Sequence, residues 1–411
     1  IGCGSCAVAC TYQARTIAHE TPWYYGTETV QERHVAHAER IGVAQKCTFC
    51  VAKVDDAKSR GLTPGVDLEV TPACAASCIT TAIHFGDFND AQSTVSQLVR
   101  DNANFQMHAE LGTDPQIRYL YEATAIPGRD QDGDEGAEGE AVAPLAGERQ
   151  TFWDVRAAMN FIMGGFGAGL AIVAYLVHLL SALPESTLTY LYVAAAVSIA
   201  IGLFSVFLEI GRKLRFALVL LRPQSSWATR EVYFVGVFYA AVLADLIWRT
   251  EALHLIAALG AAGFLYSQAR ILFGGKGIPA WRVPLMPRML IATGLFEGLG
   301  LAALATALFP GAAPFTPWVP AAGLVLATVN AVLWRRYCGE AGGQGIGPAA
   351  RREFARLTPW LHGVGHALPF GLFLGALIAG ETALWLGFGG VAVLVGGAAW
   401  KYTVIVLASY Q

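Results

Sequence analysis

Seven of the eight cysteines lie within the first 78 residues, in two groups with short spacings. The groups are Cys3-x2-Cys6-x3-Cys10, and Cys47-x2-Cys50 followed by Cys74-x3-Cys78. The spacings match parts of the C-x2-C-x2-C-x3-C run, in which short intervals bring several thiolates onto one iron–sulfur cluster. The fourth cysteine of such a run reaches a second cluster. The pattern therefore predicts iron–sulfur ligation and one-electron transfer.

Disulfide bonds and a zinc site are the alternatives to iron–sulfur ligation. Disulfides are typical of small secreted domains, whereas this domain precedes a membrane anchor. A zinc ribbon would use the second group and leave the first group without a role. The first run lacks one cysteine, which would fall one residue before Ile1, so we expect upstream sequence. Cys338 lies alone at a predicted helix end and is interpreted as a structural thiol.

The cysteine segments resemble the electron-transfer subunit of the dimethyl sulfoxide reductase family of molybdoenzymes. The resemblance rests on Cys3-Gly4-Ser5-Cys6-Ala7-Val8-Ala9-Cys10, Gln45-Lys46-Cys47-Thr48-Phe49-Cys50, Thr71-Pro72-Ala73-Cys74 and His84-Phe85-Gly86-Asp87. It implies a ferredoxin-like α+β fold with [4Fe-4S] clusters. The family has four cysteine motifs and four such clusters, and this chain matches only the third and fourth motifs, over about residues 1–125.

The resemblance also implies how the clusters share ligands. Cys10 would complete a cluster held by the absent second motif, and Cys78 a cluster held by the absent first motif. A two-cluster arrangement that exchanges Cys10 and Cys78 is the alternative. Thr11 and Ile79 stand where many ferredoxins have proline, which alters the local turn but not the ligand set.

Composition separates the chain into a polar first part and an apolar second part. Of its 411 residues, 55% are hydrophobic and only 14% charged, which is too apolar for a soluble protein of this size. We predict a ferredoxin-like iron–sulfur domain over 1–127, a flexible acidic linker over 128–150 and a membrane anchor over 151–411. The net charge of −3 excludes a basic footprint for nucleic acid.

Eight apolar stretches are long enough to cross ~30 Å of hydrocarbon. They cover 157–182, 188–209, 231–248, 252–272, 288–309, 318–337, 361–380 and 382–408. If side A denotes the side of residues 1–127, the loops returning to side A carry thirteen Lys and Arg residues, whereas the side B loops offer only Arg249. The positive-inside rule therefore predicts a multi-pass protein of the cytoplasmic membrane, with the iron–sulfur domain in the cytoplasm.

The membrane region resembles the NrfD-like anchors of the polysulfide reductase type. The order of the modules supports this, as do Arg222-Pro223-Gln224-Ser225-Ser226-Trp227 and Thr229-Arg230-Glu231. The resemblance implies an all-α membrane domain of eight transmembrane helices in two four-helix bundles that binds a quinone or quinol, either menaquinone or ubiquinone. Glycines in the first span, Gly164 to Gly169, permit close helix packing.

Polar residues at the side A ends of the first four spans are candidates for contact with quinone, because ionisable groups are costly within a membrane. These are Asn160, Glu209, Arg212, Tyr266 and Arg270, with Gln268 beside them. The alternative is snorkelling or capping at helix ends. A second set could carry protons: His178, Asp245, His254, Glu297, His366 and Lys401. For these the alternatives are interfacial polar residues and, for Glu297 with Lys401, a structural ion pair.

The leading hypothesis is a non-catalytic redox subunit of a quinone-linked oxidoreductase complex. Because this sequence has no molybdopterin-sized domain, a separate molybdopterin-containing subunit would carry out the substrate chemistry. The partners would then be that subunit, the quinone pool and the lipid bilayer. One rival is a redox-driven proton-translocating subunit. Another is a haem-b anchor, which would need facing pairs among His178, His254, His362 and His366.

Overall fold

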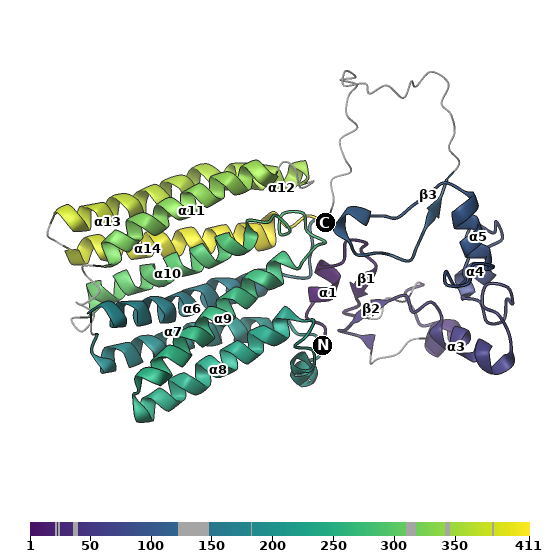
Figure 1. Cartoon of the computed structure of the whole chain (residues 1–411), viewed down its shortest axis with the longest axis horizontal. Helices are drawn as coiled ribbons and strands as arrows, with labels where there is room; N and C mark the ends of the chain where they lie inside the picture. The colour runs from purple at the N-terminus through teal and green to yellow at the C-terminus, as the bar shows by residue number, and fades with distance from the viewer. Residues whose placement is uncertain are drawn as a thin grey trace, which may run out of the picture. The chain divides into compact units, whose positions relative to one another are not determined.

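The computed structural model of the chain describes residues 1–20, 23, 25–35, 40–121, 148–181, 183–309, 318–341, 346–379 and 382–411 (Figure 1). Two compact units are distinguished: residues 1–44 with 143–411, and residues 45–142. Most of the linker predicted over 128–150 lies outside the described residues. Because residues 1–44 belong to the first unit, the first cysteine group lies in the same unit as the apolar helices.

The second unit is a small α+β region of short elements. They are α3 (Val51–Arg60), α4 (Ala73–Ala76), α5 (Thr94–Asp101), β3 (Asn104–Phe105), η2 (Ala109–Leu111) and β4 (Tyr119–Leu120). β3 and β4 pair antiparallel, with Asn104 opposite Leu120. Among its described residues, the buried apolar side chains are Ala57, Val70, Pro72 and Val95. So small a core favours stabilisation by a bound group.

The first unit contains short N-terminal elements and a set of long helices. The short elements are α1 (Ser5–Val8), β1 (Arg15–Ile17) and α2 (Val30–Val35), and β2 (Ala44–Lys46) lies at the boundary with the second unit. The long region comprises α6 (Val155–Ser181), α7 (Glu185–Glu209), η3 (Lys213–Leu221), α8 (Trp227–Trp248), α9 (Glu251–Phe273), α10 (Met286–Leu308), α11 (Val319–Ala341), α12 (Pro348–Trp360), η6 (Leu361–Ala367), α13 (Leu368–Ile378), α14 (Thr382–Tyr402) and η7 (Thr403–Leu407).

Seven helical segments in the described part of the chain are long and apolar enough to cross a membrane. They cover Val155–Ser181, Glu185–Glu209, Trp227–Trp248, Glu251–Phe273, Met286–Leu308, Pro348–Ile378 and Ala383–Leu407. The chain is thus a multi-pass membrane protein by length and composition. The remaining predicted stretch, 318–337, coincides with α11, which is less apolar because it carries Asn330, Arg335 and Arg336.

The helices pack around α6, which contacts α7, α9, α10 and α14 (Figure 1). α8 packs on α9, whereas α10 packs on α11 and α14, and α13 on α11 and α14. Glycine allows the closest approach: a Cβ added at Gly169 would lie 1.9 Å from the carbonyl oxygen of Gly294. The predicted role of the glycines in the first span is confirmed at this crossing of α6 and α10.

One π-helical segment interrupts the span Pro348–Ile378, and a second ends the final span. η6 follows Pro359, which lacks the N–H that a regular helix needs at this position. η7 ends the final helix, and its wider turn leaves carbonyl groups for other donors. The Trp281 indole N–H donates to the Val404 oxygen at 2.8 Å, and Gln150 Nε2 donates to the Ile405 oxygen at 3.2 Å. Side chains far away in the sequence thus fix the end of the chain.

Candidate functional site

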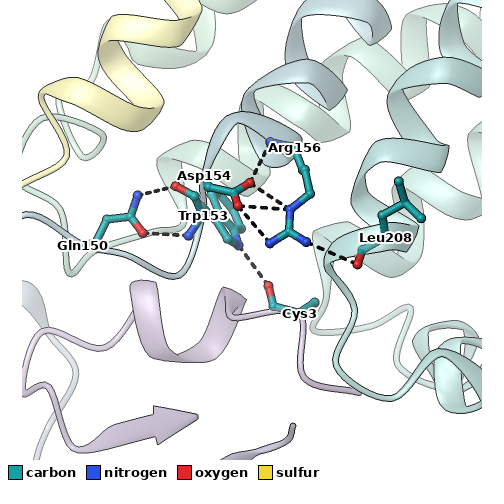
Figure 2. Close-up of polar contacts among 6 residues, drawn as sticks. All are labelled: Cys3, Gln150, Trp153, Asp154, Arg156 and Leu208. Atoms are coloured by element: carbon teal, nitrogen blue, oxygen red, sulfur yellow. Dashed lines mark hydrogen bonds and ion pairs between the residues drawn. The ribbon is translucent and has the colours of Figure 1, made fainter. Parts of the chain in front are cut away.

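The first cysteine group is attached to the start of α6 (Figure 2). The indole N–H of Trp153 donates to the Cys3 carbonyl oxygen at 3.0 Å. Trp153 is itself fixed by Gln150, whose Oε1 accepts from the Trp153 backbone N–H at 2.8 Å. One turn later, Arg156 pairs with Asp154 at 2.8 Å, and its guanidinium donates to the Leu208 carbonyl at the end of α7. The cysteine loop therefore rests on the ends of α6 and α7.

Three glycines let the backbone of the cysteine loop touch the segment after α7. A Cβ at Gly2 would lie 1.8 Å from the Gly42 oxygen, and a Cβ at Gly211 would lie 2.1 Å from the same atom. Gly2 and Gly42 both have positive φ, which glycine adopts without strain. The Gly211 N–H donates to the Gly2 oxygen at 3.3 Å, and the Arg212 N–H to the Ile1 oxygen at 3.0 Å.

The C-terminal residue, Gln411, also contacts the loop of the first cysteine group. The Gln411 side-chain amide donates to the carbonyl oxygens of Ala7 and Val8, at 3.4 and 3.3 Å. Gly277, after α9, approaches so closely that a Cβ there would lie 2.4 Å from the Val8 oxygen. Because all these contacts involve the same ends of the helices, they define side A in the structure. The first cysteine group is fixed against the side A ends of the helices.

In the second cysteine group, Cys47, Cys50 and Cys78 lie in loops and turns that direct backbone N–H groups at sulfur, whereas Cys74 lies in α4. The N–H groups of Phe49, Ala73 and Ala82 donate to Sγ of Cys47, Cys50 and Cys78, at 3.3, 3.5 and 3.3 Å respectively. The Thr80 hydroxyl and these backbone donors lower the pKa of the Cys78 thiol to about 7. Donors aimed at sulfur stabilise thiolates, which are the form that metals bind.

All eight cysteines, each within the described residues, are free thiols. Burial raises the pKa of the Cys3 thiol, which disfavours an isolated thiolate at this position. Free cysteines, N–H donors directed at sulfur and a small core together fit an iron–sulfur site. The ligand assignments and the number of iron atoms in each cluster stay predictions.

Three polar side chains meet between α6, α8 and α9, close to the side A ends. Gln268 and Asn160 lie against the buried carboxyl group of Glu231. The Gln268 amide also donates to the Asn160 backbone oxygen at 3.1 Å. One oxygen on each side chain, namely Asn160 Oδ1, Glu231 Oε1 and Gln268 Oε1, is buried without a hydrogen-bond partner. Buried polar atoms normally have partners, so this polar trio is suited to a polar ligand.

The local sequence explains why Glu231 faces inward. Ser226 caps α8 by accepting from the Thr229 N–H. The Arg230 guanidinium binds the carbonyl oxygens of Pro223 and Gln224 and lies 4.2 Å from the centre of the Trp227 ring. These contacts fix the start of α8 and direct the next residue, Glu231, into the bundle. The sequence singles out Glu231 only as part of a motif, although its charge within an apolar stretch was a usable signal.

The other predicted quinone residues are not part of the trio. Glu209 lies near Asp154 and Arg156, with its Oε1 buried and unpartnered. Tyr266 is half-exposed and its ring meets Trp227 edge to face at 5.5 Å. Arg270 also lies against Trp227, at 5.2 Å, whereas Arg212 donates to the Ile41 carbonyl at 2.9 Å. A role of Glu209 at the quinone site, and direct contact of Tyr266, Arg212 and Arg270 with quinone, stay predictions.

Glu297 and Lys401 form a fully buried ion pair between α10 and α14, with Oε2 and Nζ 2.5 Å apart. Nζ also donates to the Phe161 carbonyl at 2.8 Å. Gly165 and Gly397 flank the pair so closely that a Cβ at either would overlap it. The absence of side chains at these positions makes room for the charges.

A cavity of about 20 Å³ lies beside Gly397, large enough for one water molecule. Its polar lining includes Thr293, Asn330, His366 and Trp400. His366 Nδ1 and Trp400 Nε1 are buried without hydrogen-bond partners. Of the predicted proton-carrying residues, His366 lines this cavity, whereas Glu297 lies against Gly397 of its wall.

The four histidines of the long helical region form two ring contacts. His178 and His254 meet edge to face with centroids 5.5 Å apart, and His362 and His366 lie at the same separation within η6. Rings in contact leave no gap for a porphyrin between them, so neither of these pairs forms a haem sandwich in this arrangement. Asp245 lies 2.8 Å from His254, so the three predicted side B residues do come together.

Comparison with known proteins addresses the cysteine-rich region. It is 37% identical over 122 residues to the Hdr-like menaquinol oxidoreductase iron–sulfur subunit 1 of Archaeoglobus fulgidus, covering 29% of this chain and 42% of that protein. It is 35% identical over 127 residues to the iron–sulfur cluster-binding subunit of menaquinone reductase from Nitratidesulfovibrio vulgaris, covering 29% and 49%. The NrfC homolog of Haemophilus influenzae is 31% identical over 120 residues, covering 29% and 40%.

The N-terminal region is homologous to iron–sulfur electron-transfer subunits. The predicted resemblance of this region is thereby confirmed. The chain spans less than half the length of these curated relatives. No protein-family model matches the chain.

Replacing Cys50 with serine in the iron–sulfur region should remove or convert one paramagnetic centre, because Cys50 belongs to the most complete run of cysteines. Iron analysis and electron paramagnetic resonance of the dithionite-reduced protein measure this. Cys338→Ser is the matched control and should leave the signals unchanged. An unaltered iron content and spectrum in Cys50→Ser would contradict the assignment.

Proposed function

We propose that this chain is the electron-transfer and quinone-interacting membrane subunit of a molybdo- or tungsto-oxidoreductase complex. It would pass electrons between a molybdopterin-containing catalytic partner and the quinone pool, without substrate chemistry of its own. The observation that carries the proposal is the polar trio of Asn160, Glu231 and Gln268, with its unpartnered oxygens. The trio lies within the helices near their side A ends, and the first cysteine group is fixed against the same ends.

The geometry supports coupling between the two sites. The Cys3 carbonyl oxygen accepts a hydrogen bond from Trp153, just before α6. Asn160 lies five residues after the start of α6, about 7.5 Å along the helix axis. When bound, [4Fe-4S] clusters and menaquinone or ubiquinone would supply one-electron and two-electron transfer. The residues of this chain would hydrogen-bond the ligand and exchange protons with it. Relatives named for menaquinol and menaquinone chemistry support this choice of ligand.

The protons would reach the trio from side A. Glu209 ends α7 near the Asp154–Arg156 ion pair, whose two side chains are partly exposed. It therefore lies between the aqueous edge and the buried end of the bundle. Glu209 would relay protons, whereas Glu231 would exchange them with the ligand directly.

Changing Glu209 to glutamine should slow quinone-linked turnover while leaving the affinity for a quinone-site inhibitor unchanged. The substitution retains the shape and removes the exchangeable proton, for an expected loss of roughly 10²-fold. Reoxidation of the dithionite-reduced chain by a short-chain quinone, followed by stopped flow, measures the rate, and inhibitor titration measures binding.

Glu185→Gln, which alters an exposed carboxylate at the opposite end of α7, should behave as the unaltered chain. Wild-type rates for Glu209→Gln across the pH range would remove Glu209 from the proposal and leave the trio untouched.

The anchor is proposed to have eight spans in two four-helix bundles. α11 supports the eighth span, because it packs against α10 and α13 and is 23 residues long. α6 to α9 would form one bundle, and α10, α11, α12–α13 and α14 the other. The many basic residues of the side A loops favour a cytoplasmic side A in the cytoplasmic membrane.

Membrane-impermeant maleimide should label a cysteine introduced at Lys58 only in inverted vesicles. It should label a cysteine at Ser186, which begins α7 on side B, only in intact cells. Both positions are exposed. Labelling in the reverse pattern would overturn the orientation and the placement of the catalytic partner.

A second candidate function is redox-driven proton translocation. It is favoured by the buried Glu297–Lys401 pair and the neighbouring cavity beside His366. A pair and a water-sized cavity within the anchor are consistent with a proton route, and equally with structural neutralisation. Quinone turnover in sealed proteoliposomes without acidification of either compartment would reject translocation.

A further inference from the structure

We propose that His178, Glu251 and His254 bind a divalent transition-metal ion of the zinc class at the side B ends of α6 and α9. The three side chains offer ligand atoms that all lie within 4.8 Å of one another. Two imidazoles and a carboxylate form a donor set suited to Zn²⁺, which would take water as a fourth ligand.

Each histidine is oriented by an oxygen on its outer side. His178 Nδ1 lies 3.0 Å from the Leu183 carbonyl oxygen, which can only accept, so Nδ1 carries the hydrogen. The other ring nitrogen, Nε2, lies 2.8 Å from Glu251 Oε1, in a polar contact that a bound metal ion would replace. A backbone carbonyl holding the second ring nitrogen is the usual support for a metal-binding histidine.

In His254 the roles of the two ring nitrogens are reversed: Nε2 faces Asp245 and Nδ1 faces Glu251. Its Nε2 lies 2.8 Å from Asp245 Oδ1, in an ion-pair contact that is not aligned as a hydrogen bond. Asp245 is fixed from α7 by the Thr189 hydroxyl, which donates to its Oδ2 at 2.8 Å. The other nitrogen, Nδ1, lies 3.8 Å from Glu251 Oε2. It is fully buried and has no hydrogen-bond partner.

Charge and access favour a divalent cation from the aqueous phase. Glu251 as ligand and Asp245 behind His254 supply two negative charges, which neutralise M²⁺ in a region that disfavours net charge. The Glu251 side chain is 64% exposed, so the ion can enter from the side B surface. Tetrahedral ligands ~2.05 Å from an ion are about 3.3 Å apart, so the three ligand atoms, which lie within 4.8 Å of one another, would draw together as the ion binds.

The test uses the purified full-length chain in detergent with its clusters intact and adventitious zinc removed by a mild chelator. Calorimetric titration with Zn²⁺ should show one site per chain with micromolar or tighter affinity. X-ray absorption at the zinc edge should give nitrogen and oxygen neighbours without sulfur, which separates this site from the cysteines.

Glu251→Gln and His178→Gln should each weaken Zn²⁺ binding at least 100-fold, and Asp245→Asn roughly 10–100-fold through the orientation of His254. Glu251→Gln is the principal variant because the exposed residue can change without disturbing the fold. Glu185→Gln, an exposed carboxylate at the same end of the bundle, should bind as the unaltered chain. Absence of a site, a sulfur shell, or unchanged affinity in Glu251→Gln would each overturn the proposal.

Discussion

Replacing Glu231 with glutamine should slow quinone-linked turnover by roughly 10²–10⁴-fold, the usual contribution of a positioned proton donor or acceptor. The carboxyl group is buried, touches Asn160 and Gln268 and has a free oxygen, so it can reach a bound carbonyl or hydroxyl group directly. Glutamine retains the volume and a hydrogen-bond donor but cannot exchange the proton. Electron transfer from the catalytic partner to the iron–sulfur region should remain intact.

The measurement separates chemistry at the trio from electron supply. Stopped-flow absorbance follows reduction of the clusters by the partner and, separately, their reoxidation by quinone. Unlike Glu209→Gln, Glu231→Gln should also weaken binding of a quinone-site inhibitor, because Glu231 is proposed to contact the ligand. If Glu231→Gln reoxidises at the wild-type rate, the trio is structural and the quinone site lies elsewhere.

Substituting Lys401 with methionine should destabilise the anchor by about 3–5 kcal/mol, because it leaves the Glu297 carboxylate buried without its counter-charge. Both side chains are fully buried, so water cannot compensate. The double variant Glu297→Gln/Lys401→Met removes both charges at similar volume. It should recover most of the lost stability, since paired charges in a low-dielectric interior contribute little net free energy.

Denaturant or thermal unfolding of the detergent-solubilised protein, followed by circular dichroism, measures this cycle. Arg356→Met is a matched control, because Arg356 forms an exposed pair with Glu353 and should change stability by less than about 1 kcal/mol. Equal stability for Lys401→Met and the unaltered chain would contradict a charged pair. A double variant less stable than Lys401→Met would contradict the compensation.

The chemistry of the first domain could be predicted because it depends on local spacing. Short intervals such as Cys47-x2-Cys50 restrict which atoms can converge, whatever the rest of the chain does. The membrane helices could be predicted for a similar reason, since apolar length alone decides whether a helix can span hydrocarbon. Seven of the eight predicted stretches meet that criterion among the described residues. The remaining stretch, 318–337, corresponds to α11, where Asn330, Arg335 and Arg336 lower the mean hydropathy.

The polar site was harder to predict, because it depends on which helix faces meet. Glu209 and Glu231 both lie at side A helix ends, and the sequence favoured Glu209. Packing placed Glu231 against Asn160 and Gln268, whereas Glu209 lies near the Asp154–Arg156 pair. The fixed start of α8, with Arg230 bound to the preceding loop, determines that orientation.

By itself, the sequence determined the ligand chemistry, the membrane-spanning character and the order of the two modules, because each depends on residue type and short-range spacing. Only the tertiary structure decided how the Cys3 loop is attached to Trp153, and which side chains join from helices distant in sequence. Those contacts depend on close approach at Gly2, Gly42 and Gly169, and on helix rotation. Rotating a helix by one residue, about 100°, exchanges a buried position for an exposed one. In a uniformly apolar helix the sequence has no amphipathic periodicity that would determine this rotation.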